Sequence, residues 1–230
     1  MEKYKEKKSP IKIAIKKLKR VFFGKKSLFD SSKSYWERRY HSGGNSGSGS
    51  YNRLAEFKAE VLNDFVKEKN IRTVIELGCG DGAQLELSSY PNYVGIDVSP
   101  TAVSICKEKF AKDHTKSFFI LNNFDFTNKF YDLALSLDVI YHLVEDETFD
   151  QYMKNLFSVS KKYVVIYSSN EEKAWPAPHV RHRQFTQWVM DNQPAWEMIG
   201  HINNRYPFDE NDQENTSFAD FYIYGRKNIS

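Results

Sequence analysis

The chain has 230 residues, of which 40% are hydrophobic and 15% aromatic, a composition typical of a folded protein. This length fits one sizeable α/β domain with an appendage better than two full domains. The net charge of +3 is unevenly distributed, because residues 1–29 hold eleven Lys or Arg against two Glu. That segment carries +9 and the rest −6, so a nucleic acid partner is not expected.

The sequence also limits which compartment the protein can occupy and which metal sites it can form. Cys79 and Cys106 are too few for a disulfide framework or a Cys-based zinc site, and no metal triad is evident. No apolar run approaches the ~18 residues of a membrane span, and the basic N-terminus lacks the apolar region of a signal peptide. We expect a cytoplasmic protein, at the inner membrane surface if its N-terminal arm binds lipid.

Residues 1–29 are interpreted as a basic N-terminal arm. Within it, residues 11–23 place apolar side chains at helical spacing, with lysines on the other side. A basic amphipathic helix of this kind can lie on an anionic membrane surface. Packing on the domain, docking to a partner and a solvated tail are the alternatives.

Residues 30–70 are predicted to form a cap or lid segment followed by a helix. Residues 35–40 are rich in aromatic and arginine side chains, and residues 42–50 contain only Ser, Gly and one Asn. We interpret this stretch as a mobile lid over a site, with a plain linker as the alternative. From residue 51 to 69, apolar side chains recur at helical spacing, which predicts an amphipathic helix that enters the domain of residues 71–230.

Strands and helices then alternate along the chain, as in a doubly wound parallel sheet. The predicted strands cover residues 73–78, 93–97, 118–121, 131–136 and 163–167. The predicted helices cover residues 81–88, about 100–112 and about 146–160, and the first residues of the second are a Ser-Pro start signal. A loop over residues 171–182, a short helix at 185–190 and strands at 196–202 and 218–224 follow.

The most informative motif joins the first of these strands to three glycines at every second position, Gly78, Gly80 and Gly82. Glycines allow a sharp turn and a close approach of the backbone to a ligand. Asp97 lies about 20 residues after Glu76, at the end of the next strand, where a carboxylate can accept both hydroxyls of a ribose. The spacing is neither that of dinucleotide enzymes nor that of phosphate loops, so it predicts another nucleotide-type ligand.

With these residues in place, the stretch from Arg72 to Asn170 resembles the class I S-adenosylmethionine (SAM)-dependent methyltransferases. The resemblance implies a Rossmann-like, doubly wound, seven-stranded and mostly parallel sheet with an antiparallel final strand pair. It also implies SAM as the cofactor, with Glu76 at or behind the sulfonium pocket. The predicted SAM-binding residues are Tyr35, Arg39, Glu76, Gly78, Cys79, Gly80, Asp97, Val98, Asn123, Asp125 and Leu137. Which of Asn122, Asn123 and Asp125 meets the adenine is left open.

Methyl transfer to a hydroxyl benefits from a general base, and histidine is the usual choice. The candidates are His142, after the fourth strand, and His179 and His182, after the fifth. The predicted substrate-binding residues are Arg53, Asp138, Arg181 and Arg183. The Arg181/Arg183 pair suggests an anionic acceptor; a packing histidine and a solvated basic loop are the alternatives.

The flanking segments, residues 35–58 and 179–207, are similar to bacterial methyltransferases of surface polysaccharide and glycan synthesis. We therefore expect O-methylation of a sugar, nucleotide-sugar or glycan hydroxyl by in-line transfer. Methylation of another small molecule, a lipid or a protein, and a SAM-binding scaffold subunit, are the alternatives. No Asn/Asp-Pro-Pro-Tyr motif and no Pro-Cys follow the fourth strand, which argues against enzymes of adenine or glutamine nitrogens and of cytosine C5.

Overall fold

The structure is a computed structural model that describes residues 29–227. The chain separates into two units, residues 1–30 and 31–230, and the account below concerns the second. The predicted basic arm, with its amphipathic stretch at residues 11–23, lies outside the described residues. Among the residues that are described, no helix is long and apolar enough to cross a membrane.

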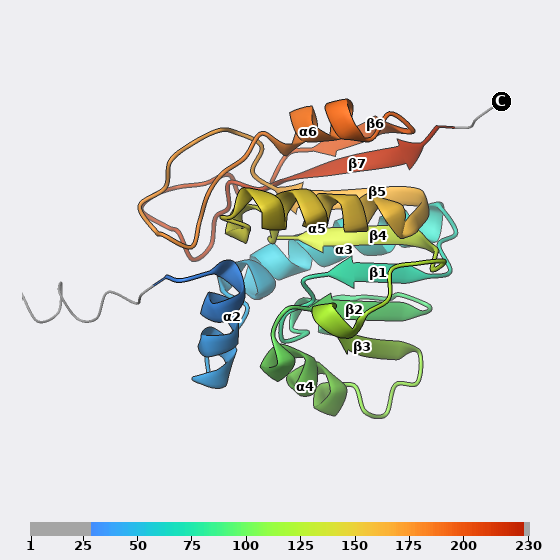
Figure 1. The fold of residues 1–230 in the computed structure, drawn as a ribbon, viewed down its shortest axis with the longest axis horizontal. Coiled ribbons are helices and arrows are strands. Elements are labelled where there is room, and N and C mark those ends of the chain that lie inside the picture. The colour runs from blue at the N-terminus through green and yellow to red at the C-terminus, as the bar shows by residue number, and fades with distance from the viewer. Residues whose placement is uncertain (1–28, 228–230) are drawn as a thin grey trace, which may run out of the picture. The chain divides into compact units, whose positions relative to one another are not determined.

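A seven-stranded sheet forms the centre of the described unit, in the order β3-β2-β1-β4-β5-β7-β6 (Figure 1). Strands β1 to β5 pair in parallel, whereas β7 pairs antiparallel with both β5 and β6. The fold class predicted from the sequence is therefore confirmed. The strands are β1 (Val74–Leu77), β2 (Tyr93–Asp97), β3 (Lys116–Ile120), β4 (Tyr131–Leu137), β5 (Ser160–Ser168), β6 (Trp196–Ile202) and β7 (Asp220–Arg226).

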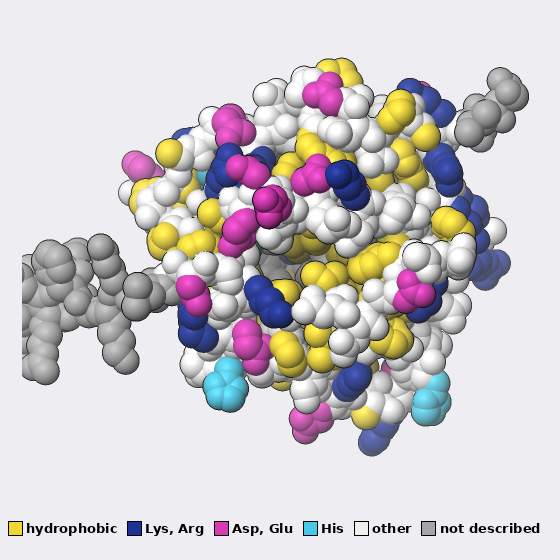
Figure 2. All heavy atoms as spheres, viewed as in Figure 1, with side chains coloured by type: hydrophobic (Ala, Val, Ile, Leu, Met, Phe, Trp, Pro, Cys, Tyr) yellow, Lys and Arg dark blue, Asp and Glu magenta, His cyan; other side chains and the backbone are white. Residues whose placement is uncertain are grey.

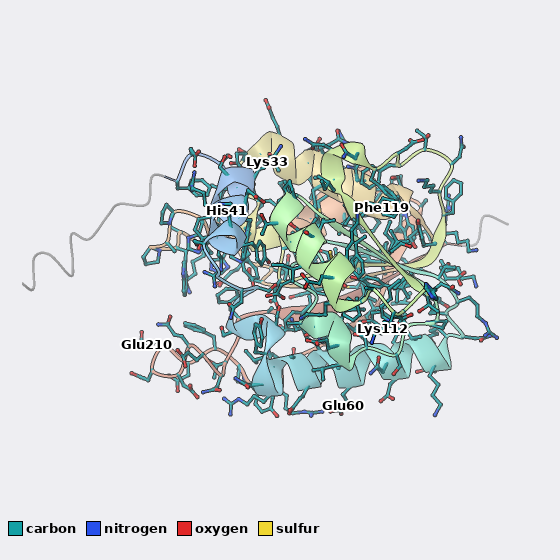
Figure 3. All side chains as sticks on the ribbon, turned by 90° about the horizontal axis from the view of Figure 1, so that it is seen from below. Lys33, His41, Glu60, Lys112, Phe119 and Glu210 are labelled. Atoms are coloured by element: carbon teal, nitrogen blue, oxygen red, sulfur yellow. The ribbon has the colours of Figure 1, made fainter. Side chains whose placement is uncertain are left out.

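Helices cover both faces of this sheet. In Figure 1, α5 lies in front of β4 and β5, and α3 lies behind the central strands. The helices are α2 (Ser32–His41), α3 (Asn52–Glu68), α4 (Pro100–Lys109), α5 (Asp146–Ser158) and α6 (Phe185–Asn192), with short 3-10 helices at Ser48–Ser50, Gln84–Leu87, Leu121–Asn123 and Ile140–His142. Figure 3 shows Glu60 on the outer side of α3 and Lys33 and His41 on α2.

Two apolar clusters, one on each face, hold the layers together. Val74 of β1 packs in one cluster with Leu62 of α3, and its neighbour Ile75 packs in the other with Met153 of α5. Successive side chains of a strand point to opposite faces, so both faces of β1 are buried. This explains why the central strands read as continuous apolar runs.

Local sequence signals set the helix starts. The Ser99 side chain accepts a hydrogen bond from the backbone N–H of Ala102 at the beginning of α4, with Pro100 in the first turn, which satisfies an otherwise unpaired N–H group. The helix predicted at residues 81–88 is shorter in the structure, a single 3-10 turn at Gln84–Leu87. Its chain then extends through Ser88 and reaches Pro91, which cannot continue a helix.

The edge of the sheet where β1, β2 and β4 end carries the polar residues that the sequence singles out. Gly78 follows β1, Asp97 closes β2 and Asp138 follows β4. These strands are neighbours, so the three residues lie side by side. In open parallel sheets ligands bind beyond this carboxyl edge, and the candidate site is found there.

Packing of α5 on the front face can be tested with Leu156→Ala. Leu156 is fully buried, and removing its side chain should lower the free energy of unfolding by about 2–5 kcal/mol. Urea denaturation measures this change. Lys154→Ala, on the same helix, removes a half-exposed side chain paired with Asp150 at 2.6 Å and should change stability by less than about 1 kcal/mol. Equal losses in the two variants would contradict the assigned packing.

Candidate functional site

A cavity of about 440 Å³ lies at the carboxyl edge of the sheet. Its wall is formed by the ends of β1, β2 and β4, by α2 and the Gly/Ser-rich loop of residues 42–50, and by residues of α3 and α5. Figure 2 shows this face of the molecule hollowed near its centre, with hydrophobic side chains inside the hollow. The volume is in the range of small-molecule and cofactor sites.

Two glycines bring bare backbone to the cavity. Gly78 and Gly80 have φ angles of +89° and +55°, a region that side-chain-bearing residues rarely adopt. A Cβ at Gly78 would collide with Val139, and one at Gly80 would lie 2.8 Å from the Tyr40 hydroxyl and against Ser46. The glycines are therefore required by both the turn and the space around it.

Asp97 ties this glycine loop to the end of β2. Its carboxylate accepts hydrogen bonds from the backbone N–H of Gly80 at 2.9 Å and of Ser99 at 2.8 Å. Burial raises the pKa of Asp97 to about 6, although these hydrogen bonds act in the opposite direction. The carboxylate lines the cavity, in the position expected for a ribose acceptor.

Glu76 forms part of the cavity wall behind the glycine loop. It is buried, and the Tyr93 hydroxyl donates a hydrogen bond to it at 2.7 Å. Burial raises the pKa of Glu76 to about 7, and the nearby Lys58 charge offsets part of that effect. A buried carboxylate without a full counter-charge favours a cationic ligand next to it.

The Gly/Ser-rich loop closes over the glycine loop through Ser46. The backbone N–H of Ser46 donates to Asp81 Oδ2 at 3.0 Å, and its hydroxyl donates to Asp81 Oδ1 at 2.8 Å. Tyr51 donates to the same carboxylate at 3.0 Å, and the hydroxyls of Tyr40 and Ser46 lie 3.0 Å apart. In this structure the predicted lid segment is held on the cavity by Asp81, which the sequence did not mark as a site residue.

Helix α2 is joined to both sides of the cavity mouth. The Ser32 hydroxyl lies 2.7 Å from a Glu145 carboxylate oxygen and 2.6 Å from the His142 carbonyl. At its middle, Glu37 accepts a hydrogen bond from Thr101 Oγ1 at 2.6 Å, at the start of α4. Trp36 and Tyr40 of α2 line the cavity between these attachments, so α2 forms its cover.

Tyr35 and Arg39, predicted to bind SAM, lie on α2 but are not on the cavity wall. The Tyr35 ring stacks on His179 with centroids 4.1 Å apart. Arg39 Nε donates to the Asn45 carbonyl at 2.6 Å and thereby braces the Gly/Ser-rich loop. Their contact with SAM therefore stays a prediction, which the cavity wall does not support.

The loop after β3 presents apolar rather than polar groups to the cavity. Leu121 lines it, as do Val98 and Leu137. Asn123 and Asp125 are exposed, and Asp125 accepts hydrogen bonds from the Thr127 N–H and hydroxyl. Their predicted contact with the adenine has no support in this geometry, because the turn at Leu121–Asn123 directs Leu121 inward.

Asp138 is held in an unusual conformation by three neighbours. Its φ of +59° is uncommon for a residue with a side chain. One carboxylate oxygen accepts from the Tyr141 hydroxyl at 2.8 Å, and the other lies 2.5 Å from the Lys58 ammonium. Gly49 of the lid packs so closely that a Cβ there would lie 2.7 Å from this carboxylate.

Lys58 is a cavity residue that was not among the predicted site residues. It belongs to α3, lines the cavity and is only 1% exposed. Its position in the apolar stripe of an amphipathic helix was the available signal, because lysine is rarely buried unless paired.

Of the three predicted histidines, only His142 is on the cavity wall. Its Nδ1 lies 3.1 Å from the His179 carbonyl oxygen. A carbonyl only accepts, so Nδ1 carries the proton and, in the neutral ring, Nε2 is left with a free lone pair. Burial lowers the pKa of His142 to about 4, which keeps the ring neutral near pH 7.

The other two histidines serve the loop after β5. His179 stacks on Tyr35 and offers its carbonyl to His142. His182 is fully buried, with Nδ1 2.7 Å from the Ser169 hydroxyl and its ring against Phe218. His182 is absent from the cavity wall, so its predicted role as a base has no geometric support.

Arg181 and Arg183, predicted to bind substrate, form hydrogen bonds and ion pairs with other residues of the protein. Arg183 is buried and donates to the carbonyls of Leu143 and Val144, and it pairs with Asp146 at 2.6 Å. Arg181 pairs with the same Asp146 at 2.9 Å. Both guanidinium groups therefore fix the start of α5 and do not form the anion site that was predicted.

Arg53 is also bound within the protein. It donates to the Asn215 carbonyl at 2.6 Å and lies over the Tyr206 ring, with its guanidinium carbon 4.4 Å from the centroid. It joins α3 to the loop between β6 and β7 and is absent from the cavity wall. Within residues 29–227 no group of three or more His, Cys, Asp or Glu side chains could hold a metal ion.

Comparison with known proteins agrees with this geometry. Residues 74–163 match a family described as a methyltransferase domain, a stretch that contains the glycine loop, Asp97, Asp138 and His142. The chain has the class I SAM-dependent methyltransferase fold. The match agrees with S-adenosyl-L-methionine, the cofactor that the sequence resemblance implies.

Solved structures share the fold at low sequence identity. The N-methyltransferase NodS from Bradyrhizobium japonicum WM9, in complex with S-adenosyl-l-homocysteine (SAH), superposes with a TM-score of 0.66 and 16% identity over 86% of this chain and 99% of that one. Magnesium protoporphyrin IX methyltransferase from Synechocystis PCC 6803 with bound SAH has a TM-score of 0.56 and 16% identity over 92% and 100%. A bacterial CtHen1 methyltransferase domain has a TM-score of 0.57 and 20% identity over 74% and 96%. No curated protein matches the sequence.

The residues present fit SAM. Gly78 and Gly80 leave backbone exposed where a Cβ would be blocked, Asp97 offers a carboxylate at the end of β2, and Val98 and Leu121 form an apolar wall suited to an adenine. Glu76 and Asp138 place negative charge beside the remaining part of the cavity. That charge suits the sulfonium of the cofactor.

Asp97 should be required for SAM binding. Asp97→Ala removes both the expected ribose acceptor and the hydrogen bond to Gly80, so calorimetry should detect no binding of SAM. Asp125→Ala is the matched control, because that carboxylate is exposed and bound to Thr127; its affinity should equal that of the wild type. Unchanged affinity in Asp97→Ala would contradict the site.

Glu76 should make the ligand-free protein less stable as the pH rises. Its folded pKa of about 7 lies above the ordinary glutamate value of 4.5, so the folded state holds the proton more tightly between these values. Stability is lost as the pH rises through them. Relative to Glu76→Gln, the free energy of unfolding of the wild type should fall by about 3 kcal/mol across this window. Urea denaturation at a series of pH values measures the difference, and a constant difference would refute the raised pKa.

Proposed function

We propose that the protein is a methyltransferase that methylates a hydroxyl of a small, neutral, polar molecule, with His142 as the general base. A sugar or sugar derivative is the acceptor class that this chemistry fits. The observation that carries the proposal is the presence of a neutral His142, with its tautomer set by the His179 carbonyl, on the same cavity wall as the glycine loop and Asp97.

Different residues of the cavity would bind the cofactor and remove the proton from the acceptor. SAM, when bound, supplies an electrophilic methyl group on a good leaving group. Asp97, Glu76 and the glycine loop hold and orient it, while the Nε2 lone pair of His142 is able to take a proton from an acceptor hydroxyl. The His142 ring lies on the cavity wall, beneath Trp36 of α2, whose ring contacts it edge-on with centroids 4.8 Å apart.

A neutral acceptor is proposed because the arginines predicted to bind an anion are paired with a carboxylate of the protein. Arg181 and Arg183 pair with Asp146, and the charged side chains around the cavity are mainly acidic. They are Lys33, Lys58, Glu76, Asp97, Asp138, Glu145 and Glu147. Such a wall repels phosphate or carboxylate groups.

The same acidic surplus favours a second candidate, methylation of an amine. Five carboxylates against two lysines on the wall would attract a protonated amine to the mouth of the cavity.

An acceptor panel distinguishes the two candidates. The purified protein is incubated with SAM and pools of sugars, nucleotide-sugars, phenols and amines, and products with one added methylene are sought by mass spectrometry. If SAM binds but none of the pools gives SAH, the scaffold alternative is favoured.

With an acceptor in hand, His142→Gln should lower kcat by about 10²–10⁴-fold, the usual contribution of general acid–base catalysis. The affinity for SAH should stay unchanged, because the ring is needed for the proton and not for the cofactor. His114→Gln, which alters an exposed histidine, should behave as the wild type. A normal kcat in His142→Gln would exclude the base, and kinetics and calorimetry on the same preparations provide both readouts.

A further inference from the structure

Lys58 places a buried positive charge on a cavity wall whose charged side chains are mainly acidic. Its side chain is 1% exposed and belongs to the apolar face of α3. Burying an ammonium is costly unless it is paired and hydrogen-bonded. The packing of α3 by itself therefore does not explain why a lysine occupies this buried position.

The pairing of Lys58 within the protein is incomplete. Its ammonium has three donor hydrogens, and the described residues give it one hydrogen-bond acceptor, Asp138 Oδ2 at 2.5 Å. The Tyr167 ring, with its centroid 5.2 Å from Nζ, adds a cation–π contact on another side. Since Lys58 lines the cavity, its remaining donors are available to a ligand there.

The order of the strands shows which part of the cofactor lies near Lys58. Asp97, the expected ribose acceptor, ends β2, and Leu121 follows β3, so these residues would hold the adenosine. Strands β1 and β4 come next in the sheet, and they carry Glu76 and Asp138 to the same wall as Lys58. The methionine part of the cofactor would therefore be held by these three residues.

We propose that Lys58 binds the α-carboxylate of the methionine moiety of SAM, while Glu76 stabilises its cationic groups. The inference rests on the cofactor of the proposed function. The amino-acid end of SAM is a zwitterion, and a positive side chain between two carboxylates is complementary to it. Asp138, held by Tyr141 and by its backbone conformation, orients the ammonium for this contact.

The test compares two probes that differ in the amino-acid part. SAH contains it, whereas 5′-methylthioadenosine keeps the adenosine and the thioether but lacks the amino acid. In calorimetry, Lys58→Met should weaken SAH binding by about tenfold or more, the scale of one lost charge-assisted contact. Binding of 5′-methylthioadenosine should change by less than about twofold, and its retention shows that the variant is folded.

Two further variants protect the test from a folding defect. Lys58→Met leaves the Asp138 charge unpaired, so Lys58→Met combined with Asp138→Asn removes both charges and should show the same selective loss of SAH. Lys58→Arg keeps the charge and should retain part of the SAH affinity. Asp97→Ala is the contrasting control, since it should weaken both probes.

The outcomes separate this inference from the proposed function. Equal weakening of both probes in the double variant would make Lys58 a structural residue and overturn the inference. Unchanged SAH affinity with a raised KM for the acceptor would assign Lys58 to the acceptor and overturn it as well. If the wild type bound neither SAH nor SAM, the cofactor assignment itself would be wrong.

Discussion

The hydrogen bond from the Gly80 N–H to Asp97 is the contact on which the rest of the site depends. It joins the turn after β1 to the end of β2 at 2.9 Å, and it requires a glycine at a position where φ is +55° and a Cβ has no room. With this contact made, the backbone of the loop faces the cavity and the carboxylate stands where a ribose can reach it. The parallel sheet serves to bring these two strand ends together.

A second carboxylate, Asp81, extends this arrangement to the cover of the site. By accepting hydrogen bonds from Ser46 and Tyr51, it connects the glycine loop directly to the Gly/Ser-rich segment. Closure of the lid and formation of the cofactor loop thus share one residue. A Gly/Ser-rich sequence is given a fixed position because Ser46 is bound to Asp81 and the Asn45 carbonyl is bound to Arg39.

The acceptor side of the cavity is organised by neutral and paired groups. The lowered pKa of His142 keeps its ring neutral, Asp138 is paired with Lys58, and Arg181 and Arg183 are both bound to Asp146. This explains why a basic motif in the sequence does not produce a basic pocket. The arginines brace the start of α5, and this bracing positions the turn that carries His142.

The sequence by itself determined the fold and the cofactor, because both depend on local patterns. Alternating apolar strands and helices predict the sheet, and the spacing of the three glycines with Glu76 and Asp97 predicts a nucleotide-type loop. SAM follows from the resemblance of this stretch to the class I methyltransferases. Only the tertiary structure decided which side chains meet across the cavity. Lys58 faces Asp138 from a helix 80 residues away, Ser46 meets Asp81, and His182 with Arg183 is buried, because these pairings depend on how α2, α3 and the loop after β5 pack against the sheet.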